Sequence, residues 1–333
     1  MKRQYVRELA EGMRVDAYFA LVSKEMRSTR AGEAYLAMEL GDRTGRMPAV
    51  YFKPSSESVS VPSGAVVTVR GTVSRFRGSK RVSVEYLAPV SDYDAGDLLE
   101  SSQRDREEVV EEFKKMAATV RDAQLRRVIR AVFGDTGFFG RFADCPGART
   151  HHHAYLGGLI EHTLAVARLC RSLGTVYPGV DVDLLTTAAL LHDIGKVDEL
   201  TWDTAVGYTD EGRLLGHVVL SDQRMRNAVA SLSPALPAGL VTRISHSILS
   251  HHGELEWGSP KRPSTIEALL LHHADNLDAK ADGFLALTAA ASHADEQWTD
   301  AVNLFRRPLY APAPLADGRP VPDMEAAHLL VRA

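Results

Sequence analysis

The hydrophobic pattern of this 333-residue chain changes its period once, close to residue 90. Before that point apolar and polar residues alternate in short runs, such as EAYLAMEL, RMPAVYF, AVVTVRGTVSRF and KRVSVEYLAPV, with the turns GDRTG and RGSK between them. Several short alternating strands with glycine turns predict a small barrel or sandwich. From Arg106 onward the apolar residues instead recur at helical spacing, as at Val109 and Phe113. The pattern predicts a multidomain protein, in which a β domain precedes an all-α bundle.

The polar stretch SDYDAGDLLESSQRD lies between the two patterns and predicts a linker, because turn-forming residues dominate it. The C-terminal stretch RRPLYAPAPLADGRPVP is rich in proline and predicts irregular structure. We therefore expect a β domain at 1–90, a linker at 91–105, a helical domain at 106–300 and an irregular tail at 301–333.

Charge and composition narrow the class of protein. The chain has 39 basic and 43 acidic residues, of which 15 basic and 9 acidic residues lie in the first 90. A basic first domain suggests an anionic partner, although chance placement on solvated faces explains the asymmetry equally well. Cys145 and Cys170 form no metal or disulfide pattern. The N-terminus is charged where a signal peptide is apolar, and no apolar run approaches the roughly 18 residues that span a membrane. We expect a cytoplasmic protein with no membrane partner.

The stretch ALLHDIGKVDEL places three polar groups in an apolar pattern that predicts one continuous helix. Burying His192, Asp193 and Lys196 without partners would be costly. On a continuous helix Lys196 projects from the same face as the other two, where it could hold a phosphate oxygen. The alternative is that Lys196 only neutralises a neighbouring aspartate.

Four further segments carry similar groups on apolar helix faces. They contribute His162 in GGLIEHTLAVARLC, His217 in LLGHVVLSD, His251 and His252 in RISHSILSHHG, and Asp275 in EALLLHHADNLDAK. Histidine and carboxylate ligands together suit zinc, manganese or iron, and buried helix faces can converge on one metal cage. A single histidine on an apolar stripe is more often a hydrogen-bonded core residue, so the prediction depends on the whole set. His246 points to another side of its helix and is expected outside the cage.

The motif H…HD…D with HDIGK resembles the HD-domain metal-dependent phosphohydrolases. The segments HHAYLGGLIEHT, LLHDIGKVDEL, EGRLLGHVV, LSHHGELEWGSPKRP and LHHADNLDAK, in this order, resemble more narrowly the YhaM-type 3′→5′ exoribonucleases. The resemblance covers nearly the whole chain and is strongest from His152 to Asp282. It implies an N-terminal OB-fold domain, an HD domain, and hydrolysis of single-stranded RNA, with DNA as an alternative, to nucleoside 5′-monophosphates.

The resemblance also implies a ligand set for two divalent metal ions, with manganese favoured over iron, zinc, magnesium, cobalt or nickel. The residues that match the ligands of one metal are His162, His192, Asp193 and Asp275, and those that match the ligands of the other are His217, His251 and His252. Asp193 could bridge the two ions because a carboxylate has two oxygens. Asp193 and Lys196 are the candidate catalytic residues.

Candidate substrate-binding residues occur in both halves. The turn SRFRGSKR places four positive charges and an aromatic ring within seven residues, at Arg75, Phe76, Arg77, Lys80 and Arg81. Basic grooves with exposed aromatic rings are typical of OB barrels that bind single strands. Further aromatic candidates are Tyr35, Tyr51 and Phe52, and either Tyr51 or Phe52 must face the core because they are adjacent on one strand.

In the helical half, Lys196, Arg149 and His152 are the residues expected at the rim of the pocket, in contact with substrate phosphates.

Two other functions fit the same residues. One is an HD phosphohydrolase that acts on a free or cyclic nucleotide, with the β domain as a regulator, although the sequence after the histidine pair, GELEWGSPKRP, contains no GYP. The other is a nucleic-acid-binding protein that keeps its metal for structure, which the complete ligand set disfavours because structural sites usually close their shell. A homo-oligomer remains open.

Overall fold

The computed structural model describes residues 2–29, 32–76, 79–102, 104–149, 153–293, 297–301 and 303–311. The chain divides into two compact units, Met1–Asp275 and Asn276–Ala333. Among the described residues no helix is both long and apolar enough to cross a membrane. The predicted site residues Arg77 and His152 lie outside the described residues, as does most of the tail.

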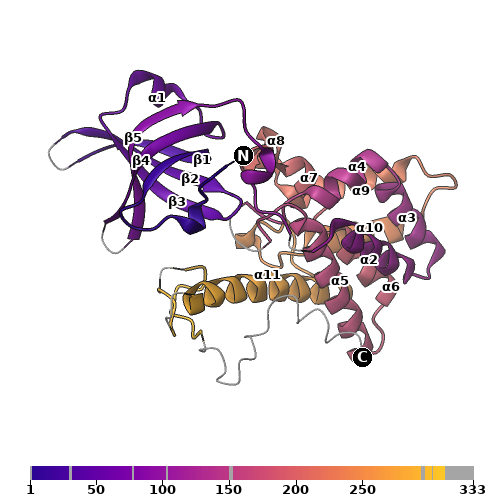
Figure 1. Cartoon of the computed structure of the whole chain (residues 1–333). Helices are drawn as coiled ribbons and strands as arrows, with labels where there is room; N and C mark the ends of the chain where they lie inside the picture. The colour runs from indigo at the N-terminus through magenta and orange to yellow at the C-terminus, as the bar shows by residue number, and fades with distance from the viewer. Residues whose placement is uncertain are drawn as a thin grey trace. The chain divides into compact units, whose positions relative to one another are not determined.

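The first unit begins with a five-stranded closed barrel in the order β1-β2-β3-β5-β4 (Figure 1). Its strands are β1 (Arg14–Ser28), β2 (Ala34–Asp42), β3 (Gly45–Phe52), β4 (Val66–Phe76) and β5 (Ser79–Pro89), and the short helices η1 (Val6–Glu8) and α1 (Ser56–Ser60) flank them. Neighbouring strands are antiparallel except β3 and β5, which pair in parallel and close the barrel. This topology is that of the OB fold, and it confirms the predicted β-barrel domain.

The strand β1 is the element that the alternating pattern did not single out. Three consecutive residues, Phe19, Ala20 and Leu21, are buried there, which breaks the alternation. Phe19 and Leu21 belong to the barrel core, whereas Ala20 points the other way and is buried in a separate cluster with Val66 and Leu98. A bulge between Leu21 and Ser23 then shifts the pairing with β2 by one residue.

The linker is tied to both neighbouring domains. Its 3-10 turn η2 (Ala95–Asp97) ends at Asp97, whose carboxylate accepts hydrogen bonds from Tyr5 (2.5 Å) and Tyr18 (2.6 Å) of the barrel. Ser101 then forms a β-bridge with Leu156 of the helical part. The segment between the domains is therefore fixed by hydrogen bonds at both of its ends.

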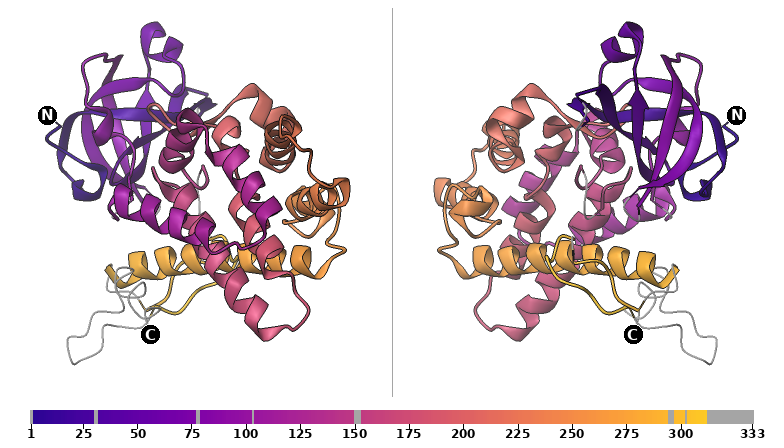
Figure 2. Two further views of the ribbon diagram at one scale, coloured as in Figure 1. Left: turned by 90° about the vertical axis from the view of Figure 1, so that its right-hand side faces the viewer. Right: turned by 90° about the vertical axis from the view of Figure 1, so that its left-hand side faces the viewer.

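The helical part is a bundle around one large apolar core (Figure 2). Its elements are α2 (Arg106–Ala118), α3 (Ala123–Phe133), α4 (Thr136–Asp144), α5 (Gly158–Val176), α6 (Val182–Leu191), α7 (Lys196–Glu199), β6 (Leu200–Thr201), β7 (Gly207–Tyr208), α8 (Asp210–Leu215), α9 (His217–Ala230), α10 (Ala238–Leu249), η3 (Leu255–Trp257) and α11 (Ile266–His293). Aspartates cap α2, α3, α4 and α6 by accepting backbone N–H groups. All residues of α6 from Leu184 to Leu191 are buried, so this helix runs through the core.

The prediction of one continuous helix over ALLHDIGKVDEL is wrong. The helix α6 ends at Leu191, a turn follows, and only Lys196–Glu199 is helical again before β6 begins. The turn contains Gly195, where a Cβ would lie 2.4 Å from the carbonyl oxygen of His217 and from the backbone nitrogen of Ser221, so only glycine fits there. The turn therefore packs against the start of α9, and this contact fixes the position of the residues that precede Gly195.

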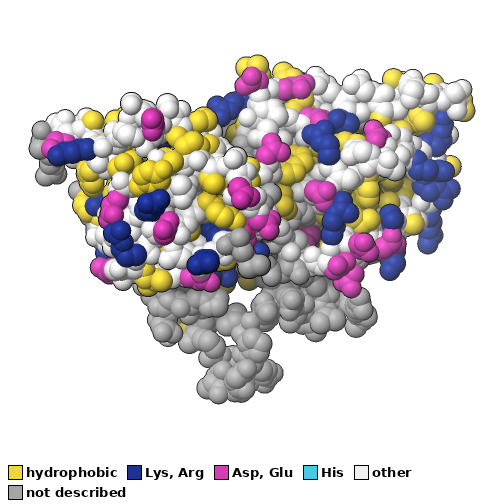
Figure 3. Space-filling model, turned by 45° about the horizontal axis from the view of Figure 1, so that its top comes forward, with side chains coloured by type: hydrophobic (Ala, Val, Ile, Leu, Met, Phe, Trp, Pro, Cys, Tyr) yellow, Lys and Arg dark blue, Asp and Glu magenta, His cyan; other side chains and the backbone are white. Residues whose placement is uncertain are grey.

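The second unit is small and partly described. Within it Phe284 packs edge-on against Phe305 with ring centres 5.5 Å apart, and Trp298 forms a β-bridge with Tyr310. On the face of the molecule seen in Figure 3, basic and acidic side chains lie interspersed among hydrophobic and neutral ones.

Candidate metal centre

The bundle brings all seven predicted ligands into one cluster, in which His162, His192, Asp193 and His251 are buried. Their positions are His162 in α5, His192 and Asp193 directly after α6, His217 at the start of α9, His251 and His252 directly after α10, and Asp275 in α11. Residues that lie up to 113 positions apart in the sequence thus converge, because each projects from the core-facing side or the end of a packed helix. We call this cluster the metal centre.

One half of the metal centre surrounds the Oδ2 atom of Asp193. The Nε2 atoms of His162 and His192 lie 3.2 Å apart and 3.5 and 3.4 Å from that oxygen. The Oδ1 atom of Asp275 lies 3.2 Å from the Nε2 atom of His162. Both imidazole rings are fully buried, so four donor atoms from three elements enclose one small volume.

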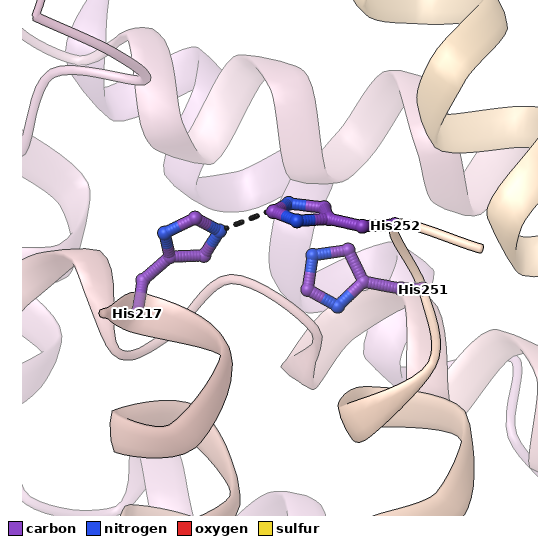
Figure 4. A group of neighbouring side chains, drawn as sticks. All are labelled: His217, His251 and His252. Atoms are coloured by element: carbon purple, nitrogen blue, oxygen red, sulfur yellow. Dashed lines mark hydrogen bonds between the residues drawn. The ribbon is translucent and has the colours of Figure 1, made fainter. Parts of the chain in front are cut away.

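The other half surrounds the second oxygen of Asp193. The Nε2 atoms of His217 and His251 each lie 3.5 Å from Oδ1 of Asp193. The Nε2 atom of His217 is also 3.2 Å from that of His252, and the three rings point toward one another (Figure 4). Asp193 therefore presents one oxygen to each half, which is the arrangement that a bridging carboxylate requires.

Hydrogen bonds at Nδ1 fix the orientation and the tautomer of three histidine rings. The Nδ1 atoms of His192, His251 and His252 lie 2.8, 2.6 and 2.8 Å from backbone carbonyl oxygens of Ala189, Ile248 and Trp257. A carbonyl only accepts, so each Nδ1 carries the proton, and each neutral ring has its lone pair on Nε2. Partners of this kind typically orient metal-ligating histidines.

The Nδ1 atom of His217 is instead held by a carboxylate. It lies 3.1 Å from both oxygens of Glu199, one of which also accepts the backbone N–H of His217 at 3.0 Å. Glu199 is buried at the end of α7 and was not among the predicted site residues. Sequence offers no signal for it, because its partner is 18 residues away and the contact depends on the turn at Gly195.

The hydrogen-bonding state of the cluster, and not only the types of its side chains, indicates a divalent metal. The Oδ1 atom of Asp193 is buried and, among the described residues, accepts no hydrogen bond. A buried carboxylate oxygen without a partner is costly, as are two Nε2 lone pairs that face each other at 3.2 Å. Ligands at right angles on a metal with bonds of about 2.1 Å lie ~3.0 Å apart. A cation in each half satisfies these atoms.

The protonation states also suit metal binding. Burial alone would raise the pKa of Asp193, but the Lys196 ammonium and the His192 imidazole outweigh it and hold that pKa well below its usual range. The pKa of Asp275 is likewise lowered despite burial, through its hydrogen bond to His162. Burial and the neighbouring His251 lower the pKa of His252 to about 3. At neutral pH the carboxylates are ionised and His252 is neutral, as ligands must be.

Lys196 lies against the metal centre rather than in open solvent. Its Nζ atom is 2.6 Å from Oδ2 of Asp193 and donates to the carbonyl oxygen of Gly147 at 2.7 Å. Burial lowers its pKa, but the contact with Asp193 raises it overall, so the lysine stays charged. The geometry is that of the alternative in which Lys196 neutralises an aspartate, and a phosphate contact remains a prediction.

Two histidines near the cluster have other partners. His246 accepts the backbone N–H of Ser264 at 2.8 Å, in keeping with its expected place outside the cage. His272 donates from Nδ1 to the carbonyl oxygen of His251 at 2.8 Å, so it supports a ligand of the second half. Gly253 has a positive φ of 80°, and a Cβ there would lie 2.4 Å from the His272 ring, so only glycine fits behind the histidine pair.

Comparison with known proteins agrees with this geometry. A family model described as HD domain matches residues 159–280. A 3′-5′ exoribonuclease YhaM of Geobacillus sp. (strain WCH70) is 33% identical over 274 residues, which are 81% of this chain and 83% of the relative. The protein of the same name from Bacillus subtilis (strain 168) is 32% identical over 273 residues, 81% of this chain and 86% of the relative. The chain belongs to the YhaM family.

The family resemblance drawn from five sequence segments is thereby confirmed. Among solved structures, the second OB-fold domain of replication protein A from Methanococcus maripaludis aligns with 27% of this chain and 97% of that domain, at 18% identity and a TM-score of 0.23. The strand order of the barrel, rather than this likeness, identifies the fold of the first domain in this YhaM-family protein.

The predicted barrel residues gather at a second place. A cleft of about 700 Å³ on the barrel has Tyr35, Phe76, Lys80 and Arg81 in its wall. Phe76 is 50% exposed, and the guanidinium of Arg81 lies 4.3 Å from its ring centre. Arg75 instead forms an ion pair with Glu11, with 3.2 Å between Nε of Arg75 and Oε2 of Glu11. Three of the four described residues of the basic turn thus line one cleft.

The two adjacent aromatic residues of β3 face opposite sides, as their strand position requires. Tyr51 packs against the barrel core, whereas Phe52 is 46% exposed. The ring of Phe52 lies 5.4 Å from that of the half-buried Tyr35, so the two form an aromatic pair. Arg149, which belongs to the helical part, has its guanidinium 5.7 Å from the ring centre of Tyr208.

Proposed function

We infer that this protein is a metal-dependent 3′→5′ exoribonuclease. The single observation that carries the inference is the metal centre, in which Asp193 offers its two oxygens to two sets of histidines. Its membership of the YhaM family supplies the class of reaction, since the relatives are named 3′-5′ exoribonucleases. We propose single-stranded RNA as the substrate and nucleoside 5′-monophosphates as the products.

Two divalent ions in such a site supply an activated water and stabilise the attacking and leaving oxygens of an in-line phosphoryl displacement. The residues of this chain hold that arrangement. Asp193 fixes the spacing of the two halves, and the backbone carbonyls behind His192 and His251 fix their rings. Lys196 offsets part of the negative charge on Asp193, so a phosphodiester approaching the site meets less repulsion.

We propose manganese as the metal because the resemblance to the YhaM-type enzymes implies it. Five imidazoles and two carboxylates form the donor set. Imidazole nitrogen suits iron and zinc, whereas carboxylate oxygen suits manganese and magnesium, and magnesium also retains several waters. The mixed set leaves iron and zinc as the ions against which manganese must be compared.

The barrel cleft supports a single-stranded nucleic acid as the substrate. Its wall combines the exposed ring of Phe76 with cationic groups, including Lys24 and Arg27 from β1. Exposed rings stack on bases of any sequence, and cations track the phosphates. A degradative exonuclease needs this kind of contact, because it must accept every base in turn.

The test uses a 5′-labelled single-stranded RNA and purified protein loaded with manganese. The label should move to progressively shorter products, with nucleoside 5′-monophosphates released, and a chelator should stop the reaction. Asp193→Ala should abolish shortening, whereas Asp203→Ala, a change at an exposed aspartate, should leave it intact. Hydrolysis of free or cyclic nucleotides without RNA shortening would contradict the proposal, and so would full activity in Asp193→Ala.

A further inference from the structure

Arg149, one of the residues expected at the rim of the pocket, lies beside an exposed tyrosine that the sequence did not single out. Tyr208 ends the strand β7 and is 38% exposed. The guanidinium of Arg149 lies 5.7 Å from the centre of its ring. In the described part of the chain no carboxylate lies within ion-pair distance of Arg149, so its charge is available to an anion.

Tyr208 is linked to a ligand of the second half through a two-stranded ribbon. It pairs with Leu200 of β6, the residue that follows Glu199. The carboxylate of Glu199 holds the ring of His217, and its backbone oxygen accepts the N–H of Thr209 at 2.9 Å. Tyr208 thus belongs to a short segment that is held by its pairing with Leu200 and by the hydrogen bond of Thr209 to Glu199. The side chain of Glu199 in turn contacts His217 of the metal centre.

Arg149 is linked to the same centre through a different segment. It lies two residues after Gly147, whose carbonyl oxygen accepts the hydrogen bond of Lys196 at 2.7 Å. Gly147 is itself packed tightly, since a Cβ there would lie 2.6 Å from that of His153.

We propose that Tyr208 and Arg149 form a nucleotide subsite at the rim of the metal centre. Tyr208 stacks on a base close to the scissile phosphodiester, and Arg149 binds the phosphate attached to that nucleotide. Stacking on an aromatic face tolerates any base, and a guanidinium pairs with phosphate through two hydrogen bonds. The subsite rests on the proposed function and names the residues that position the 3′ end for it.

The experiment pairs a change in the protein with a change in the RNA. Each of the last three nucleotides is replaced in turn by an abasic one, and kcat/KM is measured. With the wild-type protein one of these positions should lower kcat/KM by about 5- to 100-fold, the range expected for one stacked base. Tyr208→Leu should cause a similar loss on intact RNA but should lose nothing further on that abasic RNA. Tyr208→Phe should behave as wild type, because stacking needs the ring and not the hydroxyl.

The barrel provides a matched control. Tyr86 is 44% exposed, and Arg70 lies 4.8 Å from its ring centre, so Tyr86→Leu removes an equivalent pair elsewhere. It should leave kcat/KM unchanged, and metal content should be the same in all variants.

Two results would overturn the subsite while leaving the exonuclease function standing: wild-type kcat/KM in Tyr208→Leu, or equal abasic losses in wild type and Tyr208→Leu. Failure of the wild-type protein to shorten any RNA would instead overturn the proposed function.

Discussion

Glu199 allows a specific prediction about the metal centre, because its carboxylate contacts His217, which belongs to the second half. Its carboxylate lies on the far side of a ring of the second half, at 3.1 Å from Nδ1 of His217. Glu199→Ala removes this charge-assisted hydrogen bond and the partner of the His217 backbone N–H, so the ring loses both its orientation and part of its basicity.

The expected magnitude follows from the role of such partners. Removing one typically lowers metal affinity by about 10- to 100-fold, or about 1.4–2.7 kcal/mol. Glu199→Gln keeps one oxygen as an acceptor but loses the charge, so its effect should be smaller. Neither variant touches His162, His192 or Asp275, so the affinity of the first half should change little.

The assay is isothermal titration of manganese into metal-free protein, with stoichiometry checked by elemental analysis. Wild type should bind two ions, and Glu199→Ala should show one site of unchanged and one of weakened affinity. Glu107→Ala, at an exposed glutamate in the first turn of α2, serves as the control. Equal weakening of both sites, or wild-type affinity at both, would refute the assignment of Glu199 to the second half.

Three further predictions concern the lysine, the barrel and the linker. Lys196→Met should destabilise the metal-free protein by about 3–5 kcal/mol, because it leaves Asp193 buried without a cation. Added manganese should restore much of the melting temperature. A melting temperature equal to that of wild type would count against the ion pair. Phe76→Ala should raise the Kd for single-stranded RNA by about 5- to 100-fold in fluorescence anisotropy, and an unchanged Kd would exclude the barrel cleft as the binding face. The hydrogen bond to Asp97 raises the pKa of Tyr5 to about 12 from 10.0, so the stability it contributes below pH 10 is lost as the pH rises toward 12. Chemical unfolding across that range should show a smaller loss in Tyr5→Phe than in wild type, because Tyr18 still donates a hydrogen bond to Asp97 in the variant.

Much of the side-chain cluster was predictable because its residues lie in short segments of recognisable chemistry. Adjacent His192 and Asp193, and adjacent His251 and His252, are visible in the sequence, and the structure brings them together with His217. The two-domain architecture was predictable for the same reason, since a change from period two to helical spacing persists over many residues. It is confirmed by the closed barrel and by the helical HD domain.

The parts that sequence did not yield depend on tertiary contacts. The turn after Leu191 brings Gly195 against α9, a contact that no local pattern records. The strand β1 was obscured because Ala20, between the core residues Phe19 and Leu21, is also buried, in a separate cluster with Leu98. Tyr208 likewise lies beside the residue that follows Glu199 only through its pairing with Leu200 across the β6–β7 ribbon.

The central proposal is that Asp193 would bridge two divalent ions, and electron paramagnetic resonance of the manganese-loaded protein tests it most directly. Wild type should contain two ions per chain and show an exchange-coupled signal, because one carboxylate joins both ions. Asp193→Asn should lose that coupled signal together with RNA shortening. A single uncoupled ion in a fully active wild-type protein, or a coupled pair that persists in Asp193→Asn, would contradict the account.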